Sequence, residues 1–303
     1  PGTPRPLRYQ PDGSDFVITN GKGVFNRPLY SGNTGYRVDA GDLPEFAFFL
    51  PGRGGNLRFG AISNNQIIWL HEAGSVVTRY RPGSMIYEIR DDRLGGGPLV
   101  LTAIPQAGKE GLLVQAQSHA PVKLFWVFGG ANGDPGRRNG DMGGERMPLS
   151  EFFKLRPEHC RGNAFKIGTA SFTLPLKTGT LVGLAPSGTR ITIADAKHLA
   201  SPARLMESSG KPTETPLLLG ETSLSPASPA FFSFELVRPN QTPLLRAGDL
   251  PQAFAAAEKH RHDLAERIQV ATPDPFINAA AAALAVAADG IWDEKQAAYM
   301  HGA

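Results

Sequence analysis

The sequence predicts a mainly β protein, a large antiparallel β-sandwich up to about residue 245 that is followed by two helices. Short runs rich in Val, Ile, Phe and Leu alternate with Gly, Pro, Asn and Asp turns, which is typical of a sandwich or barrel. The 35 Gly and 26 Pro among 303 residues suit such a turn-rich fold. Beyond residue 249 the apolar period changes from near two to that of a helix.

The candidate strands outnumber the roughly seven to nine of an immunoglobulin-type sandwich. Asn20-Gly21 and Pro82-Gly83 supply turns between them, because glycine accepts a positive φ and proline presets its own. The strands are expected at residues 16–19, 46–50, 57–62, 66–70, 76–81, 85–89, 99–104, 112–117, 123–128, 165–172, 180–184, 190–194 and 231–236.

The helical part is expected to begin with Asp249 as N-cap and Pro251 in the first turn, and to run to about Val270. One face of this helix is partly apolar and the other is charged, as on a surface helix. Residues 272–275 then break it, and Asp274 is the expected cap of the next helix.

The second helix, within residues 276–289, is Ala-rich and apolar all round, so that it is stable only when other helices surround it. We therefore expect a longer architecture, with a sandwich at 1–245, a linker helix at 246–273 and the start of a helical domain at 274–303. Much of the chemistry is then expected beyond Ala303.

Composition excludes several classes of function. The net charge is only +3 and no Lys/Arg run is present, so no nucleic-acid partner is predicted. A single cysteine, Cys160, cannot form an intrachain disulfide, and histidine spacing predicts no metal site and no cofactor. No apolar segment is long enough for a membrane span. The chain begins at Pro1, which suggests a removed signal peptide or a cut sequence, and a periplasmic or secreted location is expected.

Two segments interrupt the strand pattern with glycine, arginine, asparagine and aspartate. The first, 31–56, contains Arg37, Asp39, Arg53 and Asn56. Sugars are recognised through their hydroxyls by planar groups of these kinds, and glycine lets a backbone approach a ligand closely. The alternative is that the glycines only form turns and that the charged residues form scaffold salt bridges.

The second segment, 129–146, has the same composition, with Arg138 and Asp141 among its polar residues. It is either functional or a mobile surface loop. We expect both segments on one side of the sandwich, facing the Ala-rich helix. Trp292 and His301 follow that helix, where a toroid would open, and a tryptophan there either stacks on a sugar or simply packs.

Several motifs together resemble a bacterial family catalogued as domain of unknown function 4450. They are Leu-Tyr-Ser-Gly-Asn-Thr-Gly-Tyr-Arg-Val-Asp-Ala-Gly-Asp at 29–42, Pro-Glu-Phe at 44–46, residues 50–58, Phe-Gly-Gly at 128–130 with Arg-Asn-Gly-Asp at 138–141, and Arg-Pro-Glu-His-Cys at 156–160. The resemblance covers essentially the whole chain. It implies a supersandwich-like domain that precedes the (α/α) toroid of a glycoside hydrolase, whereas polysaccharide lyases usually carry the toroid first.

The sequence and the resemblance together favour a carbohydrate-active enzyme that binds an oligosaccharide or polysaccharide. The full protein is expected to be a glycoside hydrolase that uses two carboxylates, with its C-terminal helical domain as partner of the sandwich. No catalytic residue is assigned. One alternative is a non-catalytic carbohydrate-binding module with exposed aromatic residues. The other is a structural domain whose Arg and Asp residues pair internally.

Overall fold

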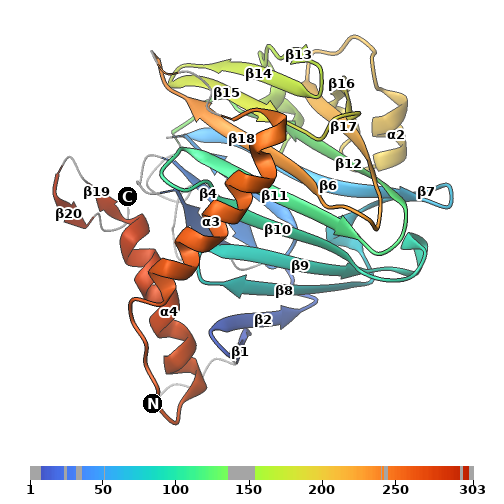
Figure 1. The fold of residues 1–303 in the computed structure, drawn as a ribbon. Coiled ribbons are helices and arrows are strands. Elements are labelled where there is room, and N and C mark those ends of the chain that lie inside the picture. The colour runs from blue at the N-terminus through green and yellow to red at the C-terminus, as the bar shows by residue number, and fades with distance from the viewer. Residues whose placement is uncertain are drawn as a thin grey trace, which may run out of the picture.

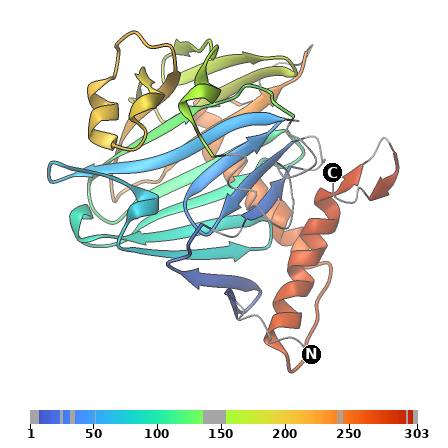
Figure 2. The ribbon, with the colours of Figure 1, turned by 180° about the vertical axis from the view of Figure 1, so that it is seen from behind.

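The computed structural model describes residues 8–23, 26–31, 36–50, 52–135, 154–239, 241, 245–293 and 296–299. Two antiparallel sheets face each other across one core, with two long helices along one side (Figures 1 and 2). The prediction of a mainly β, antiparallel sandwich is therefore confirmed. None of the helices in the described part of the chain could cross a membrane.

The first sheet has ten strands among the described residues. In spatial order they are β1 (Gln10–Asp12), β2 (Asp15–Thr19), β8 (Ser75–Arg81), β9 (Ser84–Arg90), β10 (Leu99–Pro105), β11 (Gly111–Ser118), β18 (Ala230–Val237), β15 (Gly179–Leu184), β14 (Ser171–Leu176) and β13 (Lys166–Gly168).

The second sheet has eight strands in the same described ranges. Their order is β16 (Arg190–Asp195), β17 (Pro216–Leu224), β12 (Val122–Gly129), β6 (Arg53–Ser63), β5 (Glu45–Phe49), β4 (Arg37–Gly41) and β3 (Asn26–Tyr30), and β7 (Gln66–Trp69) also pairs with β6. A small hairpin of β19 (Trp292–Asp293) and β20 (Ala298–Tyr299) follows the helices.

Aromatic rings from both sheets meet in the core. Phe48 of the eight-stranded sheet lies 5.7 Å from Phe234 of the ten-stranded sheet, and Phe128 lies 5.6 Å from Phe172, measured between ring centroids. Aromatic pairs at such distances add stabilisation beyond the area that they bury. This continuous core holds the two sheets in fixed relation, and it therefore also fixes the side chains on their outer faces.

One ring requires a glycine opposite it. Gly220 in β17 pairs directly with Trp126 in β12, and a Cβ at Gly220 would lie 2.1 Å from the indole. The fully buried ring thus folds over the glycine and occupies the space of the missing side chain. Gly60 has the same relation to Phe125.

Two long helices follow the sandwich. Helix α3 (Leu250–Ala265) lies across the outer face of the ten-stranded sheet, where Phe254 meets Phe231 at 5.5 Å (Figure 1). Helix α4 (Pro275–Gly290) packs against α3 and against β1 and β3, the end strands of the two sheets. Its Ala283 belongs to the sandwich core, so that α4 closes one side of the sandwich.

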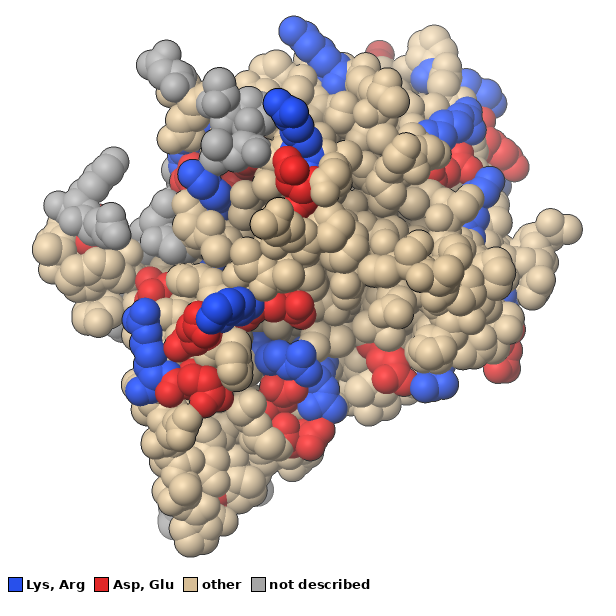
Figure 3. Space-filling model, viewed as in Figure 1, with Lys and Arg blue, Asp and Glu red and all other residues tan. Residues whose placement is uncertain are grey.

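The other face of α4 has no partner among the described residues. Ile277 is 51% exposed and Leu284 is 66% exposed, whereas Ala279 and Val286 are buried. In Figure 3, α4 at the lower left forms a ridge whose lower half bears no charged side chain, while charges of both signs intermingle above it. The sequence predicted a fully surrounded helix, and the described structure covers one of its faces.

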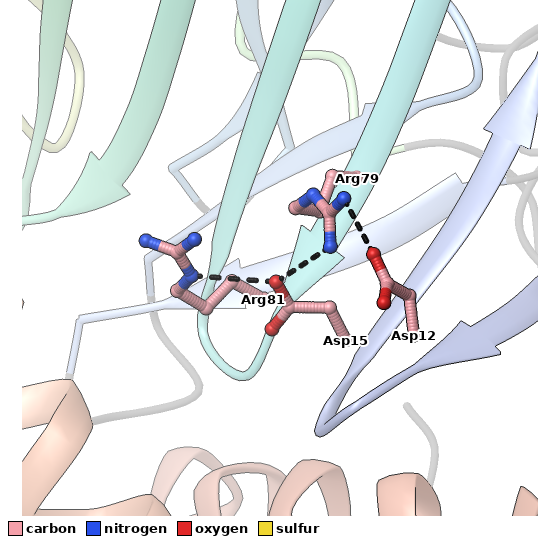
Figure 4. Close-up of polar contacts among 4 residues, drawn as sticks. All are labelled: Asp12, Asp15, Arg79 and Arg81. Atoms are coloured by element: carbon pink, nitrogen blue, oxygen red, sulfur yellow. Dashed lines mark hydrogen bonds and ion pairs between the residues drawn. The ribbon is translucent and has the colours of Figure 1, made fainter. Parts of the chain in front are cut away.

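An ion-pair network holds the first hairpin in place. Arg79 of β8 donates to Asp12 at 2.8 Å and to Asp15 at 3.1 Å, and Arg81 approaches Asp15 at 3.5 Å (Figure 4). The two carboxylates lie on β1 and β2, so the network ties this hairpin to β8. The hairpin in turn contacts α4, where Phe16 meets Phe276 at 6.5 Å.

Several predicted boundaries were wrong. Residues 31–56 do not form one irregular segment, because β4 and β5 run through them and β6 begins at Arg53. The strand expected at 165–172 is the hairpin of β13 and β14, since Ala170 adopts a φ of 49°. A short helix, α2 (Pro202–Glu207), occurs where only strands were expected.

The helix caps were predicted in part. The carboxylate of Asp274 caps α4 by accepting a hydrogen bond from the Phe276 amide at 2.8 Å, as expected. The side chain of Asp249 instead accepts a hydrogen bond from the Arg246 amide, within the 3₁₀ turn Ala247–Asp249 that precedes α3. Helix α3 ends at Ala265, earlier than Val270. The expected domain boundaries stay predictions.

Candidate functional site

Asp39, Ala47 and Asn56 form a row across β4, β5 and β6 on the outer face of the eight-stranded sheet. Asp39 pairs with Ala47, and Ala47 pairs with Asn56. Paired residues project from the same face, and the neighbours Val38 and Phe48 belong to the core on the opposite face. Only the small Ala47 methyl therefore separates the carboxyl of Asp39 from the amide of Asn56 along this row.

A second row runs beside the first. Arg37 in β4 pairs with Tyr30 in β3 on one side and with Phe49 in β5 on the other, and Phe49 pairs with Arg53 in β6. The Arg37 guanidinium carbon lies 4.4 Å from the centroid of the Phe49 ring, a distance suited to a cation–π contact. The strands thus surround Arg37 with two aromatic residues.

Three of these polar side chains have no hydrogen-bond partner within the described residues. The Asp39 side chain is only 2% exposed, and its nearest cation is the Arg37 Nε, 3.6 Å from Oδ1. Neither Asp39 oxygen accepts a hydrogen bond, and the side chains of Arg37 and Asn56 form none. Folded proteins pair nearly all buried polar groups, and the Asp39 carboxyl has only its ion pair with Arg37 within the described residues, so its oxygens keep capacity to accept hydrogen bonds.

The electrostatics of the group follow from burial and from Arg37. Burial raises the pKa of the Asp39 carboxyl, and the neighbouring Arg37 cation opposes that rise. Burial also raises the pKa of the Tyr30 phenol, with Arg37 again opposing. The Arg37 cation thus favours the ionised form of both the Asp39 carboxyl and the Tyr30 phenol.

Neighbouring charges on the same face pair internally. Arg58 forms an ion pair with Glu45, its cross-strand partner, and its guanidinium carbon lies 5.3 Å from the Trp69 ring centroid. His71 lies 3.8 Å from Glu45, and burial lowers the pKa of its imidazole. Arg58 and Glu45 thus satisfy each other, whereas the buried His71 Nδ1 has no hydrogen-bond partner within the described residues.

The beginning of the second glycine-rich segment lies beside Arg53. The Arg53 amide donates to the Asp134 carbonyl at 2.8 Å, and the Gly133 amide donates to the Arg53 carbonyl at 2.9 Å. Arg53 itself is buried and makes further contacts. The two predicted segments are therefore neighbours at this point, while Arg138 and Asp141 lie outside the described residues.

The end of α4 lies against β3. A Cβ at Gly290 would come within 2.7 Å of the Tyr30 Cβ, and the Arg261 Nη2 of α3 donates to the Tyr30 carbonyl at 2.5 Å. The segment that carries Trp292 therefore begins next to the site. Trp292 itself is half-buried and packs on Tyr299 with ring centroids 5.0 Å apart. His301 lies outside the described residues.

Tyr30 and Phe49 were missed by sequence reasoning. Their roles depend on pairing between strands, which no local pattern reveals. The spacing of Arg37 and Asp39 was a usable signal, because residues two apart on a strand share a face.

Other chemistries find little support in the described part of the chain. It contains no group of three or more His, Cys, Asp and Glu residues that could hold a metal ion. Cys160 is fully buried, and burial raises the pKa of its thiol to about 12, so the thiolate needed for nucleophilic attack is scarce.

Comparisons with known proteins identify the family. The model of the family described as Domain of unknown function (DUF4450) matches residues 50–258, and the chain belongs to this family. No curated protein matches the sequence. A solved structure from the human microbiome, provisionally named a kojibiose phosphorylase, aligns with 92% of the chain at 10% identity and a TM-score of 0.38. The chain spans 38% of the length of that protein.

Proposed function

We propose that this member of the family is the sandwich-bearing part of a carbohydrate-active enzyme, and that Arg37, Asp39 and Asn56 contact sugar hydroxyls. One observation carries the proposal: the three side chains share one face, beside Phe49, and apart from the ion pair between Arg37 and Asp39 they have no polar side-chain partner in the described structure. Sugar hydroxyls are bound by bidentate polar groups of these kinds. Arg53, Arg138, Asp141, Trp292 and His301 stay predicted contacts.

The whole enzyme, in this proposal, is a glycoside hydrolase whose helices continue beyond α4 as an (α/α) toroid. The exposed apolar face of α4 supports this, since burying a leucine such as Leu284 contributes about 1.5–3 kcal/mol. A C-terminal helical domain of the same protein is the proposed partner of that face. A periplasmic or secreted location fits a polysaccharide substrate.

A free-standing carbohydrate-binding module is the weaker alternative. Such a module would bind sugars through exposed aromatic residues, and among the large apolar side chains exposed in the described residues Tyr299 is the sole aromatic one. Phe49 is buried, and Asp39 more so. This arrangement favours a site that another part of the protein completes.

A comparison of the hydrolytic activity of the full-length protein with that of residues 1–303 tests the proposal. Glycoside hydrolysis needs two carboxyl groups about 5–10 Å apart, one of them with a raised pKa. In the described residues, acids such as Glu45 and Glu110 are engaged by Arg58 and Arg238, so residues 1–303 alone should show no turnover. The full-length protein should hydrolyse members of a panel of plant and algal oligosaccharides. Equal turnover by residues 1–303 would place the catalytic pair inside the sandwich.

Binding measurements test the site itself. Arg37→Met and Asn56→Ala should each weaken binding of the best oligosaccharide about tenfold, as expected for the loss of a hydrogen bond worth about 1.4 kcal/mol. Lys123→Met, at an exposed position of β12, is the matched control. Unchanged binding by both site variants would remove this face from the sugar site.

A further inference from the structure

The pair of Arg37 and Asp39 places hydrogen-bond donors beside acceptors. The two side chains lie on one face of β4, with the Arg37 Nε 3.6 Å from the Asp39 Oδ1. A guanidinium only donates and an ionised carboxylate only accepts. A ligand that satisfies both must accept from one side chain and donate to the other at neighbouring atoms. Hydroxyl groups do both.

The depth of the two groups differs. Asp39 is 2% exposed in its side chain and Arg37 is 13% exposed, and Asn56 across Ala47 is also partly exposed. A ligand that rests on Arg37 and Asn56 therefore brings one group toward Asp39 as the deepest contact. That group must be a donor, because Asp39 lacks one within the described residues.

A carboxylate on the ligand would be opposed here. The charges of Arg37 and Asp39 balance each other, and the two other arginines of this face are engaged, Arg58 by its ion pair with Glu45 and Arg53 by contacts of its own. A like charge within about 4–6 Å of a carboxylate disfavours the ionised state of both groups. A uronate would also place acceptors against the acceptors of Asp39 and leave those oxygens unpaired.

We infer that the Arg37–Asp39 pair recognises two adjacent hydroxyls of a neutral sugar ring and selects against uronic acids at this position. One hydroxyl donates to Asp39 while its neighbour accepts from Arg37, and the Asn56 amide is placed for a third. The inference rests on the proposed function and names the substrate class of the same site. Asp39 is then the residue that determines specificity.

Matched sugar pairs test the inference on the full-length protein. The probes are the methyl glycosides of glucose, galactose and mannose, each compared with the corresponding methyl glycosiduronate by titration calorimetry. Each pair differs only in whether carbon 6 carries a hydroxyl or a carboxylate. At least one neutral glycoside should bind, and its uronate should bind about tenfold more weakly or worse.

Two variants assign the discrimination to Asp39. Asp39→Asn keeps the size of the side chain but removes the charge, so it should reduce the preference for the neutral member at least about fivefold. Glu88→Gln makes the same chemical change on the other sheet, at an exposed ion pair with Arg90, and should leave the preference unchanged. Circular dichroism confirms that each variant is folded.

The outcomes separate the inference from the function on which it rests. If no sugar of any pair binds to the wild-type protein, the proposed function fails. If a uronate binds as tightly as its neutral partner, or if Asp39→Asn keeps the full preference, the inference is overturned while the sugar-binding function stands.

Discussion

Replacing Arg261 with methionine should loosen the two helices from the sandwich by about 1–3 kcal/mol. Arg261 is only 3% exposed and lies against β3, against α4 and against the turn between β8 and β9. Its Nη2 donates to the Tyr30 carbonyl of β3 at 2.5 Å, and its Nη1 lies 3.9 Å from Asp289 of α4. Its Cδ also occupies the space beside Gly83, in the turn between β8 and β9, where a Cβ would lie 2.7 Å away.

The magnitude follows from these contacts. A hydrogen bond from a charged donor contributes about 1.5–3 kcal/mol, and the ion pair with the partly exposed Asp289 adds about 0–1 kcal/mol. Burial lowers the pKa of Arg261 because it disfavours the cation, and removal of the charge therefore avoids part of the cost of desolvation. Methionine keeps most of the side-chain length, so that no large cavity opens.

Hydrogen exchange measures the effect where it should occur. Amides of α4 and β3 should open about 5- to 150-fold more often in Arg261→Met, while amides of β10 and β11 should change little. Lys259→Met on the same helix removes only an exposed pair with Asp263 and should leave amide exchange in α4 close to that of the wild type. If the amides of α4 exchange as slowly in Arg261→Met as in Lys259→Met, Arg261 does not hold the helices to the sandwich.

Three further predictions concern stability and reactivity. Gly220→Ala should lower the free energy of unfolding in urea by about 1–2 kcal/mol, because its Cβ would displace the buried Trp126 ring. Hydrogen bonds from Arg93 hold the pKa of Asp91 below its ordinary value of 3.8. The stability that ionised Asp91 contributes above about pH 4 is therefore lost as the pH falls further, so unfolding of the wild type and of Asp91→Asn should converge in acid. Cys160 should not react with Ellman's reagent at about pH 8 until the protein is unfolded, because burial raises its thiol pKa to about 12.

Controls distinguish these effects from general damage. Gly248→Ala should be nearly neutral, since no atom lies within 4 Å of its added Cβ, and equal losses at both glycines would contradict the packing argument. Asp92→Asn, beside Asp91, should keep the wild-type acid response. Rapid labelling of Cys160 in the folded protein would show that its surroundings open readily.

Much of the sandwich could be predicted because its strands carry a local signal. The run at 112–117 corresponds to Gly111–Ser118, and the run at 231–236 corresponds to Ala230–Val237. In both strands, apolar side chains line the core, so the apolar run marks the strand. The Pro275 start and the Asp274 cap of α4 were equally visible, since a helix start requires only nearby residues.

The errors came from strands whose stability depends on distant partners. β4 has Val38 and Ala40 in the core but Arg37 and Asp39 on its other face. Its charged residues and the glycines around it are typical of turns, so the sequence predicted an irregular segment there. β6 begins at Arg53 and not at 57, because it includes Gly54 and Gly55, where Leu50 and Phe128 fill the space of the missing side chains. Composition found Arg37, Asp39 and Asn56 as candidates, but only the register between strands showed that they share one face.

The position of α4 between β1 and β3 has a consequence for the order in which the protein folds. Among the described residues these strands end the two sheets, and there each leaves one row of backbone donors and acceptors without a strand partner. The helix that covers this side follows β3 by more than 200 residues along the chain. During synthesis both strand edges therefore stay uncovered until residues 275–290 have emerged from the ribosome. In this interval they can pair with strands of other chains. Early release or slow translation before that point should favour aggregation over folding, and a chaperone that holds β1 and β3 would act in this interval.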